Sequence, residues 1–131
     1  MFLNFLLRRN KKIKKLKIGI IGCGGIANGK HMPSLKELDN VEMVAFCDLI
    51  IERVEEAVKK YGVDGAKCND KYEDMHANEK LDVVHVCTPN NAHAPASFAA
   101  MEAGCYVMCE KPMAKTVEQA QGIDRYFELE H

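Results

Sequence analysis

The stretch KIGIIGCGGIA, residues 17–27, decides the fold because a short apolar run passes directly into a glycine-rich turn. The run from 17 to 22 predicts a buried strand. The turn reads G-x-G-x-x-A, with Gly22, Gly24 and Ala27 at the three positions. The first glycine permits a tight turn, the second lets a pyrophosphate approach the backbone, and the small third residue lets helix and strand pack closely. A preceding strand and a following helix are the context that indicates dinucleotide binding.

The glycine turn supplies the first candidate binding residues. We assign Gly22, Gly24, Gly25 and Ile26 to the cofactor, because N–H groups at the start of a helix attract phosphate. An ordinary glycine-rich turn between strand and helix is the alternative.

Apolar runs and helical patterns alternate along the rest of the chain. The runs are continuous, which predicts a parallel sheet covered by helices on both faces, a doubly wound α/β fold. We expect five strands in the order 3-2-1-4-5. The expected strands are 17–22, 41–48, 65–70, 82–90 and 105–109, and the expected helices are 26–38, 50–62, 71–80, 91–104 and 115–129.

Several residues mark the expected helix ends. Pro33 lies inside the first helix and would kink or restart it, and Thr116 is a plausible N-cap of the last. Gly62 and Gly104 are expected stops. In the helix over 50–62, five residues form the apolar stripe: Ile51, Val54, Ala57, Val58 and Tyr61.

Composition limits the classes of function. The chain of 131 residues fits one domain, and 18 basic against 19 acidic residues leave a net charge of -1, which favours neither nucleic acid nor an anionic membrane. The six cysteines form no C-x-x-C and no zinc spacing. Those in apolar runs, Cys47, Cys87, Cys105 and Cys109, are expected to be buried, reduced thiols of a cytoplasmic protein.

Both ends fall outside the expected domain, which covers residues 16–128. Residues 1–15 place an apolar segment before a basic one, the reverse of a secretory signal, and are too short to span a bilayer. We expect a flexible leader or a short helix, with contact to a membrane surface as the alternative. Residues 129–131, LEH, resemble the start of a histidine tag, so the natural protein is expected to be longer.

Asp48 ends the second expected strand, 26 residues after Gly22. A carboxylate at about this offset hydrogen-bonds the ribose 2′-hydroxyl and repels a 2′-phosphate. Because the nearest basic residue is Arg53, the pattern favours NAD over NADP. An N-cap role in the following helix is the alternative reading of Asp48.

The segment CTPNNAH, residues 87–93, follows the strand expected beside the first, where the strand order reverses and ligands bind. Thr88 and Pro89 would form a rigid turn along the cofactor. Asn90 and His93, three residues apart, could share a face of the next helix and also belong to the candidate cofactor site. A capping or solvated role is the alternative for His93, and we assign no role to His31, His76 or His85.

The segment CYVMCEKPMAK, residues 105–115, is a buried strand that ends in an acid, an amine and a proline. If it lies beside the fourth strand, its end opens onto the same crevice. Glu110 would then accept hydrogen bonds from ribose hydroxyls, and Lys111 would donate to the substrate oxygen at the carbon that exchanges hydride. Pro112 favours an extended backbone at Lys111. A surface loop with a chance ion pair is the alternative.

Together these motifs resemble the glucose–fructose oxidoreductase and inositol dehydrogenase family (Gfo/Idh/MocA), over about residues 16–127. The E-K-P triplet and C-T-P-N-x-x-H are more specific than the glycine turn, in which Ala27 replaces the third glycine. The resemblance implies that Lys111 is the catalytic lysine, that Glu110 contacts the nicotinamide ribose, that Asp48 selects NAD, and that Asn90 and His93 line the nicotinamide side.

The resemblance also implies parts that this chain lacks. Family members continue into a sixth strand and a large α/β domain, which carries the small-molecule substrate pocket, further acid–base residues and much of a homo-oligomer interface. We therefore expect the cofactor domain of an NAD-dependent sugar or polyol oxidoreductase, itself inactive. An NAD-dependent glycosidase of the same family and a non-catalytic dinucleotide-binding module are the alternatives.

Overall fold

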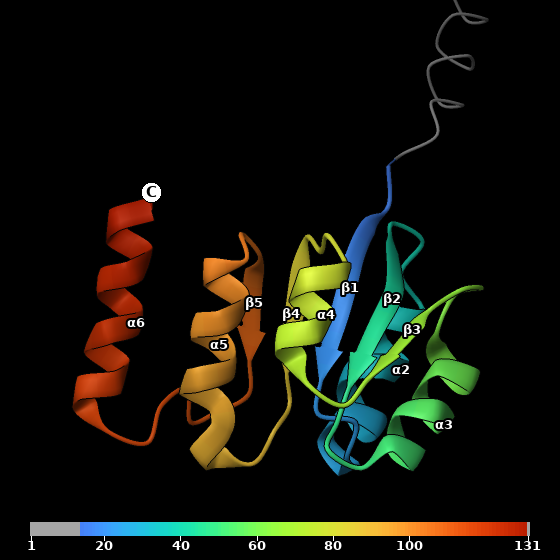
Figure 1. The fold of residues 1–131 in the computed structure, drawn as a ribbon, viewed down its shortest axis with the longest axis horizontal. Coiled ribbons are helices and arrows are strands. Elements are labelled where there is room, and N and C mark those ends of the chain that lie inside the picture. Colours follow the sequence, from blue (N-terminus) through green and yellow to red (C-terminus); the bar gives the residue numbers. More distant parts are fainter. Residues whose placement is uncertain (1–13, 131) are drawn as a thin grey trace, which may run out of the picture.

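The computed structural model describes the backbone of residues 14–130 and the side chains of residues 14–126. Most of the expected leader and the last residue of the expected tag remnant lie outside these residues. The strands are β1 (Leu16–Ile21), β2 (Val41–Cys47), β3 (Lys67–Asn69), β4 (Val83–Val86) and β5 (Tyr106–Cys109) (Figure 1). The helices are η1 (Ala27–His31), α2 (Met32–Lys36), α3 (Ile51–Tyr61), α4 (Tyr72–Asn78), η2 (Asn90–Ala92), α5 (His93–Glu102) and α6 (Val117–Glu130).

All five strands are parallel and lie in the order β3-β2-β1-β4-β5, which confirms the predicted topology. β1 is the central strand and pairs with β2 and β4. The β1–β2 register shifts between Ile18 and Gly19, where β2 holds one extra residue. β4 ends at Val86, earlier than predicted, so residues 87–89 form the loop that leads to η2.

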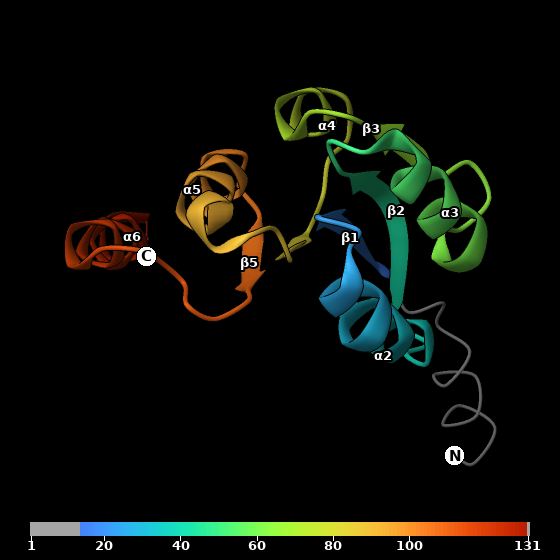
Figure 2. The same ribbon diagram turned by 90° about the horizontal axis from the view of Figure 1, so that it is seen from below.

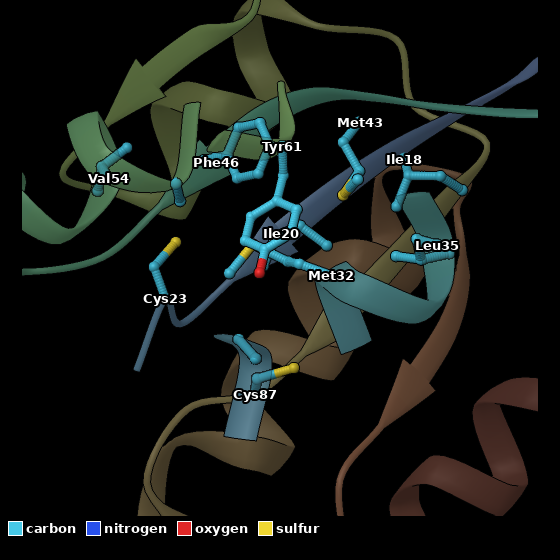
Figure 3. Packing of buried hydrophobic residues seen from close by; sticks show 12 residues of the cluster. Ile18, Ile20, Cys23, Met32, Leu35, Met43, Phe46, Val54, Tyr61 and Cys87 are labelled. Atoms are coloured by element: carbon cyan, nitrogen blue, oxygen red, sulfur yellow. The ribbon is translucent and has the colours of Figure 1, made fainter. Parts of the chain in front are cut away.

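Helices cover both faces of the sheet (Figure 2). On one face, Ile18 and Ile20 of β1 pack with Met32 of α2 and Val54 of α3, in the cluster drawn in Figure 3. On the other face, the buried cluster includes Met75 of α4 and residues of β4 and α5. Neighbouring residues of β1 are thus buried on opposite faces, which explains why its sequence is apolar without alternation.

The first helical segment restarts beside Pro33, as expected, but a π turn precedes the restart. Residues 25–36 are helical throughout, but Ala27–His31 form a π turn before the α-helix restarts at Met32, with Pro33 in its first turn. Because a π turn holds an extra residue, it shifts the buried face. Met32 and Leu35 are buried, whereas Ile26 and Leu38, at the two ends of the expected helix, are exposed.

The helix ends marked by the sequence lie where predicted, but the conformation of Gly62 and the exposure of Ile51 differ from expectation. Thr116 Oγ1 accepts a hydrogen bond from the N–H of Gln119, which confirms the expected cap of α6, and Gly104 follows α5 with a positive φ of 85°. Gly62 ends α3 in an extended conformation, where a Cβ would lie 2.7 Å from the carbonyl oxygen of Val58. Ile51, expected in the buried stripe of α3, is exposed at its start.

The cysteines are all reduced, and three of the four expected to be buried are so: Cys47, Cys87 and Cys105. Cys109 is only half-buried, because β5 is an edge strand. No helix within residues 14–130 has both the length and the apolar character needed to cross a bilayer.

Candidate functional site

The register of the sheet brings four predicted segments to one edge. Ile21 of β1 pairs with Cys47 of β2 and Val86 of β4, and Val86 pairs with Cys109 of β5. The strands are parallel, so the next residue of each lies at the same edge: Gly22, Asp48, Cys87 and Glu110. The glycine turn and Lys111 therefore share this edge, two strand spacings or about 10 Å apart.

Gly22 is held tightly at the end of β1. Its N–H donates to the carbonyl of Cys47 (2.8 Å), and its φ is 92°. A Cβ here would lie 2.6 Å from the carbonyl carbon and oxygen of Cys87 and 2.8 Å from the nitrogen of Thr88. This position therefore requires glycine for the fold itself, because a side chain would push the β4 loop away from β1.

Gly24 and Gly25 instead border open space. A Cβ on Gly24 would meet only Arg53 Nη1, at 3.6 Å, and one on Gly25 would meet nothing within 4 Å. The two glycines line a cavity of about 260 Å³ with Cys23, Asn28, Arg53 and Glu56. The turn thus leaves room for a group that a side chain would displace, as a bound pyrophosphate requires.

Asn28 braces the glycine turn, a role that the motif spacing did not reveal. Its side-chain Nδ2 donates to the carbonyls of Cys23 (2.8 Å) and Gly24 (2.9 Å). The signal in the sequence was an amide residue directly after the motif, four residues beyond Gly24.

Asp48 connects the end of β2 to two backbone segments. Oδ2 accepts a hydrogen bond from the N–H of Cys23 (2.8 Å), and Oδ1 accepts one from the N–H of Ile50 (2.9 Å). The N-cap of α3 is Ile50 itself, so Asp48 precedes the cap and does not occupy it. The half-buried carboxylate fixes the glycine turn. It places negative charge beside Cys23, at the edge of the cavity described above, which is called the groove below.

His93 joins the loops after β4 and β5. The ring is 1% exposed, with Nδ1 2.5 Å from the carbonyl oxygen of Pro112 and Nε2 2.7 Å from that of Thr88. Both partners are acceptors, so both hydrogen bonds form together only when both ring nitrogens carry a proton. Asn90, expected to share its face, lies exposed in η2, whereas His93 is buried.

The hydroxyl of Thr88 is buried without a hydrogen-bond partner. Native proteins rarely leave a buried hydroxyl unpaired. This orphaned atom lies in the loop where the strand order reverses, the point at which ligands bind in sheets of this kind.

The E-K-P triplet begins where β5 ends. The N–H of Glu110 donates to the carbonyl of Val86 (3.0 Å), which makes Glu110 the last residue held by the sheet. Lys111 and Pro112 are exposed, and the peptide bond between them is cis. Lys111 thus lies on the loop after β5, directly after Glu110 at the edge of the sheet.

Two histidines to which the sequence analysis assigned no role form a hydrogen-bonded chain with Glu110. His31 Nε2 is 2.8 Å from Glu110 Oε1, and His31 Nδ1 is 2.9 Å from Nδ1 of His85. The hydrogen bond from His31 is the main cause that lowers the pKa of Glu110, and burial, followed by the charge of His31, lowers the pKa of His85 to about 4. The usable signal was His85, a polar residue inside the apolar strand VVHV.

The buried thiols at this edge are poor nucleophiles. Burial is the largest cause that raises the pKa of Cys23 and of Cys87 to about 12. Both thiols are therefore protonated at neutral pH, and a thiolate is the form that attacks. The part of the chain from 14 to 130 also contains no cluster of three or more histidine, cysteine or acidic residues able to hold a metal ion.

Comparison with known proteins agrees with this geometry. The sequence profile of the Gfo/Idh/MocA group, described as "Oxidoreductase family, NAD-binding Rossmann fold", matches residues 16–130. D-glucoside 3-dehydrogenase of Escherichia coli is 41% identical over 106 residues, which are 81% of this chain and 30% of that protein. Inositol 2-dehydrogenase of Salmonella typhimurium is 36% identical over 108 residues, 82% of this chain and 32% of the relative.

Solved structures share the fold. The WlbA dehydrogenase from Chromobacterium violaceum, in complex with NADH and UDP-GlcNAcA, has a TM-score of 0.81 at 32% identity, over 90% of this chain and 33% of that one. A 3-ketoreductase from Actinomadura kijaniata, in complex with TDP-benzene and NADP, has a TM-score of 0.80 at 24% identity, over 88% of this chain and 36% of that one, and is similar in fold. The chain spans about a third of the length of the curated relatives.

Proposed function

This chain belongs to the Gfo/Idh/MocA oxidoreductase family, and on that premise we propose that it binds NAD for an enzyme that transfers hydride between nicotinamide and a sugar, polyol or related alcohol. The observation that carries the proposal is the shared edge. The glycine turn, the orphaned hydroxyl of Thr88 and the E-K-P triplet follow β1, β4 and β5 at one end of the sheet.

We assign a different part of the cofactor to each group of residues along this edge. Gly24 and Gly25 leave room for the pyrophosphate beside the N–H groups at the start of the helix. Thr88 offers its hydroxyl, and Glu110 offers a carboxylate oxygen to a ribose hydroxyl. The bound nicotinamide supplies the carbon that accepts or donates hydride.

Lys111 is the residue that we propose acts on the substrate. Its ammonium group stabilises negative charge that develops on the substrate oxygen and eases removal of the proton. His93, fully buried between the Thr88 and Pro112 carbonyls, supports both loops without touching the ligand.

We also propose that NAD is preferred over NADP. The carboxylate of Asp48 at the edge of the groove repels a 2′-phosphate, whereas Arg53 on the same groove acts in the opposite direction. Titration of the chain with NADH and NADPH tests the preference. Asp48→Asn is expected to reduce the difference between the affinities for NADH and NADPH. Tighter binding of NADPH by the wild-type chain would reverse the assignment.

Gly24→Ala tests the cofactor site. Its Cβ meets only one arginine nitrogen at an ordinary contact distance, so the fold should tolerate it while the groove loses space. We expect about tenfold weaker NADH binding, comparable to losing one hydrogen bond to a charged group, with an unchanged midpoint of urea unfolding. A wild-type chain that binds neither NADH nor NADPH would refute the proposal, as would a variant that binds equally well.

Lys111→Ala tests the catalytic assignment when it is made in the whole enzyme and assayed with sugars and polyols. NADH formation should be lost while NADH affinity is kept, because the amine acts on the substrate. Retained activity would show that Lys111 is not catalytic, and release of free sugar without net NADH formation would indicate a glycosidase instead.

A further inference from the structure

Three titratable side chains form a hydrogen-bonded row behind the nicotinamide end of the proposed site. Glu110 comes from the end of β5, His31 from the π turn η1, and His85 from the middle of β4. The distances are 2.8 Å from Glu110 Oε1 to His31 Nε2, and 2.9 Å between the Nδ1 atoms of the two histidines. The side chains of Glu110 and His31 are 25% and 11% exposed, and His85 is buried.

The chemistry of the row limits its proton arrangement. A carboxylate only accepts, so His31 Nε2 carries a proton. The two facing Nδ1 atoms share one proton, because one must donate and the other accept. Burial keeps His85 neutral, with a pKa of about 4, so a neutral His31 requires His85 to donate, and a charged His31 requires His85 to accept.

The π turn explains how His31 reaches a strand end that is distant in sequence. His31 is the last residue of Ala27–His31, and the extra residue in this turn changes the direction in which the helix presents it. π turns inside helices occur frequently at functional sites. The turn thereby connects the first crossover of the fold to Glu110, which lies 79 residues later.

We propose that His31 is a positioning residue that holds the Glu110 carboxylate for the nicotinamide ribose, and that His85 fixes the proton arrangement of His31. The proposal rests on the proposed function, since it assumes that Glu110 faces the cofactor. The other groups around Glu110 do not replace His31: the backbone N–H and charge of Lys111 also favour its ionised form, while Cys87 and Cys109 are thiols with raised pKa values.

A double-mutant cycle on NADH affinity separates positioning from packing. The variants of the 131-residue chain are His31→Phe, Glu110→Gln and the pair, with NADH binding followed by NMR chemical shifts. We expect His31→Phe to weaken binding about three- to tenfold, as for a lost hydrogen bond to a partly exposed charge, and less than twofold when Glu110 is already Gln. Equal losses in both backgrounds, or no loss, would overturn the proposal.

Two further variants control for packing. His31→Gln keeps a donor near Glu110 and should bind NADH nearly as tightly as the wild type. This variant also tests the proposal if His31→Phe fails to fold. His76→Phe, on α4 away from the edge, is the matched control and should bind NADH as the wild type does. Failure of His31→Gln to recover affinity while it folds normally would count against the proposal.

The row is also observable without any ligand. ¹⁵N spectra of the histidine rings should show a proton on His31 Nε2 and a neutral His85 at pH 7. Absence of that Nε2 proton would overturn the positioning role. A wild-type chain with these signals that binds neither NADH nor NADPH would instead refute the proposed function and, with it, the ligand that His31 serves.

Discussion

Replacing Gly22 by alanine should destabilise the fold strongly. The new Cβ would lie 2.6 Å from the carbonyl carbon and oxygen of Cys87 and 2.8 Å from the Thr88 nitrogen, all backbone atoms that no rotamer change can move. A φ of 92° adds about 1–2 kcal/mol of backbone strain for alanine. Displacing the β4 loop also weakens the hydrogen bond from Cys87 N–H to the Ile21 carbonyl (2.7 Å), worth about 1 kcal/mol.

Together with the steric overlap, these effects predict a loss of about 3–4 kcal/mol from a total of about 5–15 kcal/mol. The midpoint of thermal unfolding should fall by about 10–20 °C. Urea unfolding followed by circular dichroism measures the change, and Gly25→Ala, whose Cβ meets nothing within 4 Å, is the matched control and should stay within about 0.5 kcal/mol of the wild type. If Gly22→Ala lost less than about 1 kcal/mol, the close approach of β1 and the β4 loop would not be as tight as described.

Three other predictions concern stability and reactivity. The folded pKa of His85 lies near 4, below its ordinary value of 6.5, so the free energy of unfolding should fall as the pH drops from about 6.5 towards 4, by up to about 2 kcal/mol; a urea midpoint unchanged between pH 6.5 and 5 would contradict this. Met75→Ala should lose about 2–5 kcal/mol in urea unfolding, because Met75 is fully buried against the sheet; a loss below about 1 kcal/mol would contradict that packing. Iodoacetamide should modify exposed Cys68 first, as measured by mass spectrometry. Earlier labelling of any of the four buried cysteines would contradict this: Cys23, Cys47, Cys87 or Cys105.

The sheet, and the meeting of the candidate site residues at one edge of it, could be predicted because the signals were local. Continuous apolar runs gave the parallel strands, and the glycine turn located β1. Parallel strands end at a common edge, so the residues after each strand had to meet: Gly22, Asp48, Cys87 and Glu110.

The supporting contacts could not be predicted in the same way. The hydrogen bond between His31 and Glu110 joins residues 79 positions apart and depends on a π turn. The sequence of residues 27–31 does not distinguish this π turn from a regular α-helix. The position of His93 depends on where the loop after β5 returns, 19 residues later, so its sequence did not distinguish a buried bridge from an exposed cap.

The central position of β1 has a consequence for synthesis on the ribosome. β1, β2 and β3 need only the chain up to residue 69, whereas β4, the other neighbour of β1, begins at Val83. One side of β1 thus remains unpaired during elongation until β4 leaves the exit tunnel. We expect the nascent chain to be most open to chaperones and proteases in this interval, and to become resistant once β4 joins the sheet.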